Sequence, residues 1–151
     1  MKAREITDAA VHAIGDGYDH VRLNLANGDM VGHTGNLAAS ITAVECVDQQ
    51  LARLETAVTQ AGGLLLITAD HGNADEMFMR KGENVLRDAN GAPLPRTSHT
   101  LNPVPFIVFD PKKRVHTLLD QPASIASVGT TILELCGIQA PDGYLPGLVR
   151  P

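Results

Sequence analysis

Apolar residues recur at every third or fourth position in three stretches of the chain, the spacing that places side chains on one face of an α-helix. The longest stretch covers residues 36–60, where leucine, isoleucine and valine return at this spacing until Gly62 and Gly63 interrupt it. Glycine is typical of the position just after a helix. The same pattern predicts shorter helices over residues 3–14 and 124–136.

Three other stretches have the patterns of β-strands. Residues 20–26 alternate between polar and apolar side chains, and residues 64–69 form an apolar run typical of a strand covered on both faces. Residues 104–109 predict a third strand, in which Pro105 indicates an edge position or an irregular start. Because strands and helices alternate along the chain, we predict an α/β fold with a parallel sheet.

The dipeptide Asn90–Gly91 is typical of a tight β-turn. It lies between the second and third predicted strands, and we expect a hairpin over residues 76–96. The hairpin either flanks a functional site or is a surface feature without a role.

Composition limits the classes of partner and the compartment. The 151 residues are enough for one domain, and the net charge of −5 argues against nucleic acid or an acidic membrane as a partner. No run approaches the roughly 20 apolar residues of a membrane span, and the charged, amphipathic start does not resemble a signal peptide. With Cys46 and Cys136 expected as reduced thiols, we predict a cytoplasmic protein.

Two carboxylates and three imidazoles are distributed over the three segments that flank the predicted strands. Asp29 and His33 follow the first strand, Asp70 and His71 end the second, and His99 precedes the third. In parallel α/β sheets, functional residues gather at the carboxyl edge of the strands. We therefore expect these five side chains to lie near one another.

A mixture of carboxylates and imidazoles without thiolates suits Mn²⁺, Zn²⁺, Co²⁺ or Mg²⁺ better than a structural zinc site. Either a helical turn or a glycine-rich loop can bring Asp29 and His33 together, and Gly72 allows the backbone turn that Asp70 and His71 need to reach one ion. Five ligands are too many for one catalytic ion and too few for two complete shells. The sites are therefore rich in water, or further ligands are missing.

Other residues have plainer interpretations. A single histidine near the end of a strand is more often a hydrogen-bonded structural residue than a ligand. The prediction of a metal site therefore depends on the five residues taken together. His12, His20, His116 and the basic run at 112–114 are expected at the surface. The chain has none of the motifs G-x-S-x-G, G-x-x-x-x-G-K-[ST] or G-x-G-x-x-G, and no serine with an evident base beside it.

Three motifs in order, "NGDMVGHTGN", "TADHGNADEM" and "TSHTLNPVPFI", resemble the cofactor-independent phosphoglycerate mutases of the alkaline phosphatase superfamily. The resemblance extends from Ile6 to the "APDGYLPGL" near the end of the chain. It implies a three-layer α/β sandwich with a mostly parallel sheet, incomplete in this chain. Residues 1–151 would be the carboxyl-terminal part of the metal-binding domain, with a hairpin insertion at about 76–96.

The resemblance also implies a reaction and its ligands. The family interconverts 3-phosphoglycerate and 2-phosphoglycerate through a phosphoserine, with two divalent ions, Mn²⁺ being the first expectation. By motif position, Asp29, His33 and His99 would hold one ion, and Asp70 and His71 the other. Together the two ions would activate the nucleophile and neutralise charge on phosphorus.

Departures from the family's pattern leave alternatives open. Gly28 stands where the family has proline, which loosens the backbone before Asp29. The family's nucleophilic serine, a further metal-binding aspartate and the basic substrate domain lie upstream and have no counterpart here. The isolated chain is therefore expected to be inactive and to self-associate through exposed sheet edges. A phosphatase or phosphodiesterase of the same superfamily and a non-catalytic metal-binding fragment remain the alternatives.

Overall fold

A computed structural model describes residues 1–115, 117–118 and 124–150, so that His116 lies outside the described residues. The chain divides into two compact units, Met1–Phe109 and Asp110–Pro151. The elements in chain order are α1 (Ala3–Gly15), α2 (Asn27–Gly32), α3 (Leu37–Ala61), β1 (Leu65–Thr68), β2 (Arg80–Lys81), β3 (Asn84–Val85), β4 (Phe106–Phe109), β5 (Thr117–Leu118), α4 (Ser127–Leu135) and β6 (Val149–Arg150).

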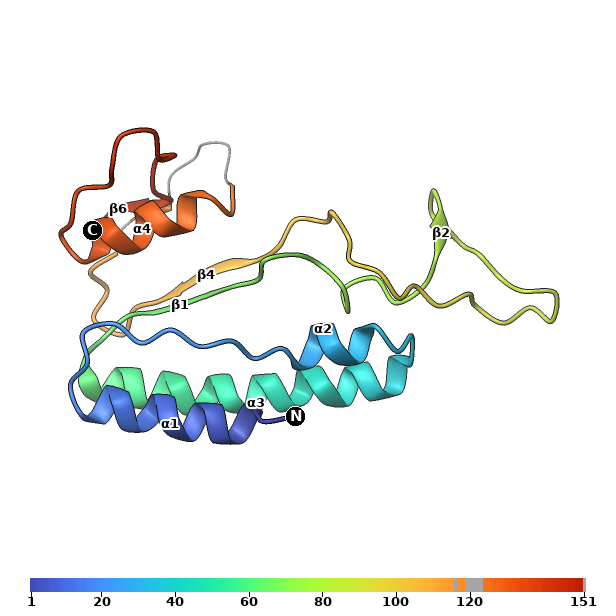
Figure 1. The fold of residues 1–151 in the computed structure, drawn as a ribbon, viewed down its shortest axis with the longest axis horizontal. Helices are drawn as coiled ribbons and strands as arrows, with labels where there is room; N and C mark the ends of the chain where they lie inside the picture. The colour runs from blue at the N-terminus through green and yellow to red at the C-terminus, as the bar shows by residue number, and fades with distance from the viewer. Residues whose placement is uncertain (116, 119–123, 151) are drawn as a thin grey trace. The chain divides into compact units, whose positions relative to one another are not determined.

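The helices α1 and α3 lie side by side and form the main core of the first unit (Figure 1). Small side chains such as Ala10 let the two backbones approach, and Leu54 of α3 is almost fully buried. At the solvent edge of this packing, Arg53 forms an ion pair with Asp8. None of the described helices is both long enough and apolar enough to cross a membrane.

Both ends of α3 are set by side-chain and backbone chemistry that the sequence indicates. Asn36 precedes the helix, and its side-chain oxygen accepts a hydrogen bond from the Ala39 amide at 3.0 Å. At the other end Gly62 adopts φ of 67°, a left-handed conformation that favours glycine. The helix predicted over 36–60 is confirmed.

The predicted parallel sheet is wrong for the part of the chain that is described. β1 pairs with β4 in the antiparallel sense, with Leu65 opposite Phe109 and Thr68 opposite Phe106, and the two other small sheets are also antiparallel. A parallel pair needs a crossover that returns the chain to its starting end. Here the segment between β1 and β4 contains no helix. It brings the chain back to the end of β1 at which it left, so β4 runs in the opposite direction (Figure 1). The described residues accordingly do not form a three-layer sandwich.

The strand predicted over residues 20–26 is also wrong. Val21, Leu23 and Leu25 are half-buried while Arg22 is exposed, so the alternation in burial exists. A strand also needs a hydrogen-bonding neighbour, and this segment pairs with no other described residue. It therefore runs as extended chain from α1 to α2 (Figure 1).

Residues 76–96 reverse direction twice. β2 and β3 pair across a turn in which Gly82 has φ of 63°, and this turn was not predicted. The second reversal uses Asn90 and Gly91, where the Asp88 carboxylate accepts from the amides of Asn90 and Ala92. The excursion thus folds on itself before returning to β4.

In the second unit, α4 covers most of the helix predicted over 124–136, and Gly137 follows it with φ of 73°. Two buried threonines of α4 attach the carboxyl-terminal segment to it. The Thr131 hydroxyl accepts from the Leu148 amide at 2.8 Å, and the Thr130 hydroxyl donates to the Leu145 carbonyl at 2.7 Å.

Candidate metal centre

The short helix α2 carries Asp29, and His33 directly follows the last residue of this helix. Its last turn is closed by a hydrogen bond from the His33 amide to the Asp29 carbonyl at 3.1 Å. Residues four apart on a helix share one side. Of the two arrangements that the sequence allowed, the structure therefore has the helical turn.

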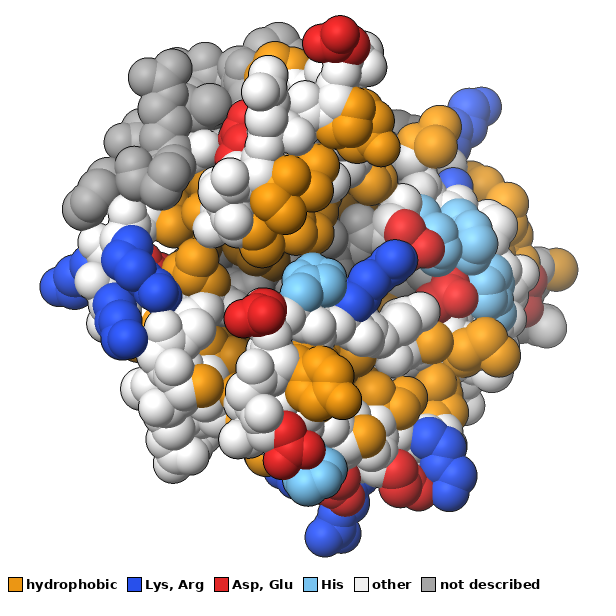
Figure 2. All heavy atoms as spheres, turned by 60° about the vertical axis from the view of Figure 1, so that its left-hand side comes forward, with side chains coloured by type: hydrophobic (Ala, Val, Ile, Leu, Met, Phe, Trp, Pro, Cys, Tyr) orange, Lys and Arg blue, Asp and Glu red, His pale blue; other side chains and the backbone are white. Residues whose placement is uncertain are grey.

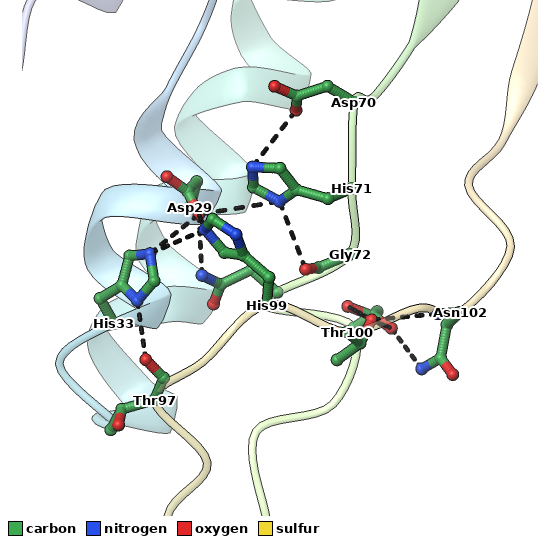
Figure 3. A network of polar contacts seen from close by, with 11 residues as sticks. Asp29, His33, Asp70, His71, Gly72, Thr97, His99, Thr100 and Asn102 are labelled. Carbon is green, nitrogen blue, oxygen red and sulfur yellow. Dashed lines mark hydrogen bonds and ion pairs between the residues drawn. The ribbon is translucent and has the colours of Figure 1, made fainter. Parts of the chain in front are cut away.

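His99 reaches the same place from the loop that leads into β4. The Thr100 amide donates to the Gly72 carbonyl at 2.8 Å, which ties this loop to the turn after β1. A side chain from a distant part of the sequence is thereby held next to α2 (Figure 3).

Three ligand-type atoms form a nearly equilateral triangle. Asp29 Oδ1 lies 3.2 Å from His33 Nε2 and 3.1 Å from His99 Nε2, and the two Nε2 atoms are 3.1 Å apart. These residues form a group of potential metal ligands whose donor atoms all lie within 4.8 Å of one another. Figure 3 shows the three side chains directed at a common space.

The triangle fits a divalent cation. Donor atoms that bind one ion at about 2.0–2.2 Å lie roughly 3–3.5 Å from one another, which is the spacing seen here. One carboxylate and two imidazoles are also a donor set that divalent transition metals accept. Three protein ligands leave room for water or substrate on the ion.

The orientation of His33 is fixed by its other ring nitrogen. Nδ1 lies 2.7 Å from the Thr97 carbonyl oxygen, and because a carbonyl can only accept, Nδ1 carries the proton. In the neutral imidazole the lone pair is then on Nε2, the atom in the triangle. A backbone carbonyl that holds the far nitrogen is a usual support for a metal-ligating histidine.

Asp70 and His71 lie beside the triangle rather than in it. Asp70 Oδ1 is 3.5 Å from His71 Nε2, and His71 Nδ1 is 4.0 Å from Asp29 Oδ1. The ring of His71 stacks on that of His99 with centroids 3.6 Å apart. The structure thus brings all five predicted residues into one region, with Asp70 and His71 as a separate pair; their assignment as metal ligands stays a prediction.

The site is open to solvent. The side chains of His99 and Asp29 are 48% and 32% exposed, whereas that of Asp70 is 86% exposed. The space-filling view shows imidazoles and carboxylates together at the surface (Figure 2). Water can therefore reach these side chains.

A set of polar residues that was not predicted from the sequence joins the two loops that carry His71 and His99. Asn102 donates to Asp75 Oδ2 at 2.7 Å, and the buried Thr100 donates to the same atom at 3.1 Å. Burial alone would raise the pKa of Asp75, but these hydrogen bonds hold the pKa below its usual value. The sequence did hold a sign of these residues, because they stand in the quoted motifs within a few positions of Gly72 and His99.

Comparison with known proteins places the chain in a superfamily. The sequence profile of the metalloenzyme superfamily matches residues 1–140. The chain belongs to this superfamily. The match covers nearly the whole chain and includes all five predicted site residues.

Several members of the superfamily resemble the chain closely. A 2,3-bisphosphoglycerate-independent phosphoglycerate mutase of Trypanosoma brucei brucei is 52% identical over 99% of the chain, and one of Nicotiana tabacum is 44% identical over the same share. The chain spans 28% of the length of each relative. The predicted resemblance to independent phosphoglycerate mutases is confirmed for this portion.

A solved structure agrees with the fold. The crystal structure of Leishmania mexicana phosphoglycerate mutase at low cobalt concentration matches 99% of the chain with a TM-score of 0.92 and 46% identity. The match covers 28% of that chain. The antiparallel pair and the long helix thus lie in the portion of the chain that matches part of that crystal structure.

Proposed function

We propose that the chain forms the metal-binding part of an enzyme that interconverts 3-phosphoglycerate and 2-phosphoglycerate. The observation that carries the proposal is the triangle of Asp29 Oδ1, His33 Nε2 and His99 Nε2. The match to part of several mutases supports the substrate. We further propose that the protein acts in the cytoplasm, since Cys46 and Cys136 are both unpaired thiols.

Each residue of the site has a part in this proposal. Asp29, His33 and His99 hold one divalent ion, and Asp70 with His71 supplies two ligands to a second. When bound, the ions neutralise charge on the phosphoryl group and lower the pKa of an attacking hydroxyl. The stacked rings of His71 and His99 keep the two ligand groups adjacent. Mn²⁺ is the expected metal, with Co²⁺, Zn²⁺ and Mg²⁺ as alternatives.

A hybrid enzyme tests the proposal. The chain would replace the matching portion of the Trypanosoma brucei brucei mutase, to which it is 52% identical. We expect the hybrid to interconvert the two phosphoglycerates when Mn²⁺ or Co²⁺ is present. Asp29→Ala in the hybrid should lower kcat by about 100-fold or more, because a ligand of the ion is lost.

Two controls are needed to interpret the activity of the hybrid. His12→Ala, an exposed position on α1, should leave the activity of the hybrid unchanged. Release of free phosphate in place of the isomer would favour a phosphatase of the same superfamily. A folded, metal-loaded hybrid without either activity would instead indicate a non-catalytic metal-binding fragment.

A further inference from the structure

A buried side chain outside the predicted ligand set contacts the central carboxylate. Asn73 is only 6% exposed, and its Nδ2 lies 2.8 Å from Asp29 Oδ1. Since a carboxylate can only accept, the amide nitrogen of Asn73 is the donor. Asp29 Oδ1 is also the carboxylate oxygen of the triangle, 3.2 Å from His33 Nε2 and 3.1 Å from His99 Nε2.

Asn73 can take this position because Gly32 of α2 has no side chain. A Cβ added to Gly32 would lie 3.0 Å from Asn73 Cγ, would overlap its Oδ1, and would approach the Ala74 amide at 3.5 Å. Gly32 is itself buried in the last turn of α2. Asn73 therefore occupies the space that any larger residue at position 32 would fill.

We propose that Asn73, seated against Gly32, is a positioning residue that fixes the Asp29 carboxylate toward His33 and His99. The inference rests on the proposed metal function and extends it to two residues that are not ligands. Without the amide, the Asp29 carboxylate is free to rotate about its last side-chain bond. Binding an ion would then carry the entropic cost of restricting this rotation, so the affinity for the ion would be lower.

The size of the effect follows from the general behaviour of such residues. Removal of a hydrogen-bonding partner of a metal ligand typically lowers metal affinity by about 10–100-fold. We expect a loss in this range for Asn73 variants, because the amide donates to the one carboxylate in the triangle.

Titration of the 151-residue chain with Co²⁺ tests the inference, with affinity and the visible d–d spectrum as readouts. Asn73→Ala removes the amide and leaves a gap, whereas Asn73→Leu fills the space but cannot donate. Both variants should bind Co²⁺ about 10–100-fold more weakly and alter the spectrum. Near-normal affinity of Asn73→Leu would show that packing alone matters and would overturn the inference. Unfolding of the metal-free variants is followed in parallel, so that affinities are compared between folded proteins.

Gly32→Ala displaces Asn73 without changing it, and should weaken Co²⁺ binding in the same way. The control is Gly15→Ala at the end of α1, where the added Cβ meets no atom within 4 Å. Its affinity should equal that of the unsubstituted chain. Equal affinities in all variants would overturn the inference alone. Absence of Co²⁺ binding by the unsubstituted chain would overturn the metal proposal together with the inference.

Discussion

At the scale of single residues, the five side chains differ in how their positions are determined. Asp29 and His33 are fixed by one turn of α2 and by the Thr97 carbonyl. Asp70, which is mostly exposed, has only the imidazole of His71 within ion-pair distance among the described residues. We therefore expect the two predicted ion positions to respond differently to substitution.

Substitution of Asp70 or His71 should remove one ion without unfolding the chain. Asp70→Asn or His71→Ala is expected to lower the bound Mn²⁺ measured by elemental analysis, because the second position has only these two ligands here. His12→Ala, on the exposed face of α1, should keep full loading. Equal metal content in all three variants would contradict the assignment.

A second prediction at this scale concerns Asp110. Burial alone would raise its pKa, but hydrogen bonds from the Val115 amide, the Arg114 side chain and neighbouring amides lower the pKa to about 2 from 3.8. Because the folded-state pKa is depressed, these contacts stabilise the fold fully above about pH 4 and are lost as the pH falls toward 2.

An NMR pH titration of the Val115 amide reports this change, since that amide donates to Asp110 Oδ2 at 2.9 Å. The expected midpoint is close to 2, and Asp110→Asn should abolish the titration. A midpoint near 3.8 would show that the carboxylate is not held as the structure has it.

At the scale of elements, two loops are joined by a clasp, which we define as Asp75, Thr100 and Asn102. The clasp links the turn after β1, which carries His71, to the loop before β4, which carries His99. A Cβ on Gly72 would meet the side chains of both Asp75 and Thr100, so the turn fits against the clasp without spare room.

Removal of one hydroxyl should loosen the clasp. Thr100→Val keeps the shape of the side chain but removes the donor to Asp75, and should lower the free energy of unfolding by about 1 kcal/mol. It should also weaken metal binding, because His99 is its neighbour. Thr42→Val, which removes an exposed hydroxyl on α3, is the control for thermal unfolding. A Thr100→Val variant as stable as Thr42→Val would argue against the clasp.

The end of α3 offers a second prediction for an element. Gly62→Ala should destabilise the fold by roughly 1 kcal/mol, since its φ of 67° is unfavourable for alanine. In Gly63→Ala the new Cβ would have only an ordinary contact with Val58 Cγ1 at 3.5 Å. Chemical denaturation compares the two, and an equal loss for both would contradict the left-handed end of the helix.

The sequence predicted helices better than sheets, for a physical reason. The helix over 36–60 depends on local spacing and on Gly62, both visible in the sequence. The direction of β1 relative to β4 depends on how the intervening excursion returns, and residues 20–26 depend on a neighbour that the described chain lacks. Strand pairing is set by distant residues, so alternation of polar and apolar positions cannot determine it.

The candidate site was predictable to a similar extent. Carboxylates and imidazoles beside the expected strands predicted that five side chains gather, although the first of these strands and the parallel sheet are not seen among the described residues. The grouping of Asp29, His33 and His99 was implied only by the resemblance to the mutases. The role of Asn73 could not be read from the sequence, because it follows from the space beside Gly32 and from the direction of one hydrogen bond.

At the scale of the whole molecule, the first unit exposes apolar side chains that a monomer rarely leaves in a row. On α3, Leu37, Ile41 and Val44 are each more than 40% exposed and recur at helical spacing. β1 has β4 as its one partner among the described strands, which leaves its other edge free to pair.

The isolated chain should therefore self-associate. Light scattering at micromolar concentration is expected to give a mass above that of a monomer, and Ile41→Lys should reduce association by placing a charge in the apolar row. Glu45→Gln, which changes the net charge equally at an exposed neighbouring position, should not. A stable monomer over a wide range of concentration would refute this expectation.

The central claim is that Asp29, His33 and His99 bind one divalent ion, and the position of that ion tests it most directly. Crystals of the 151-residue chain grown with Mn²⁺ would be measured for anomalous scattering. The account predicts a peak about 2.0–2.3 Å from an Asp29 carboxylate oxygen and from the Nε2 atoms of His33 and His99. A Mn²⁺ peak elsewhere, or none between these three side chains at saturating Mn²⁺, would contradict it.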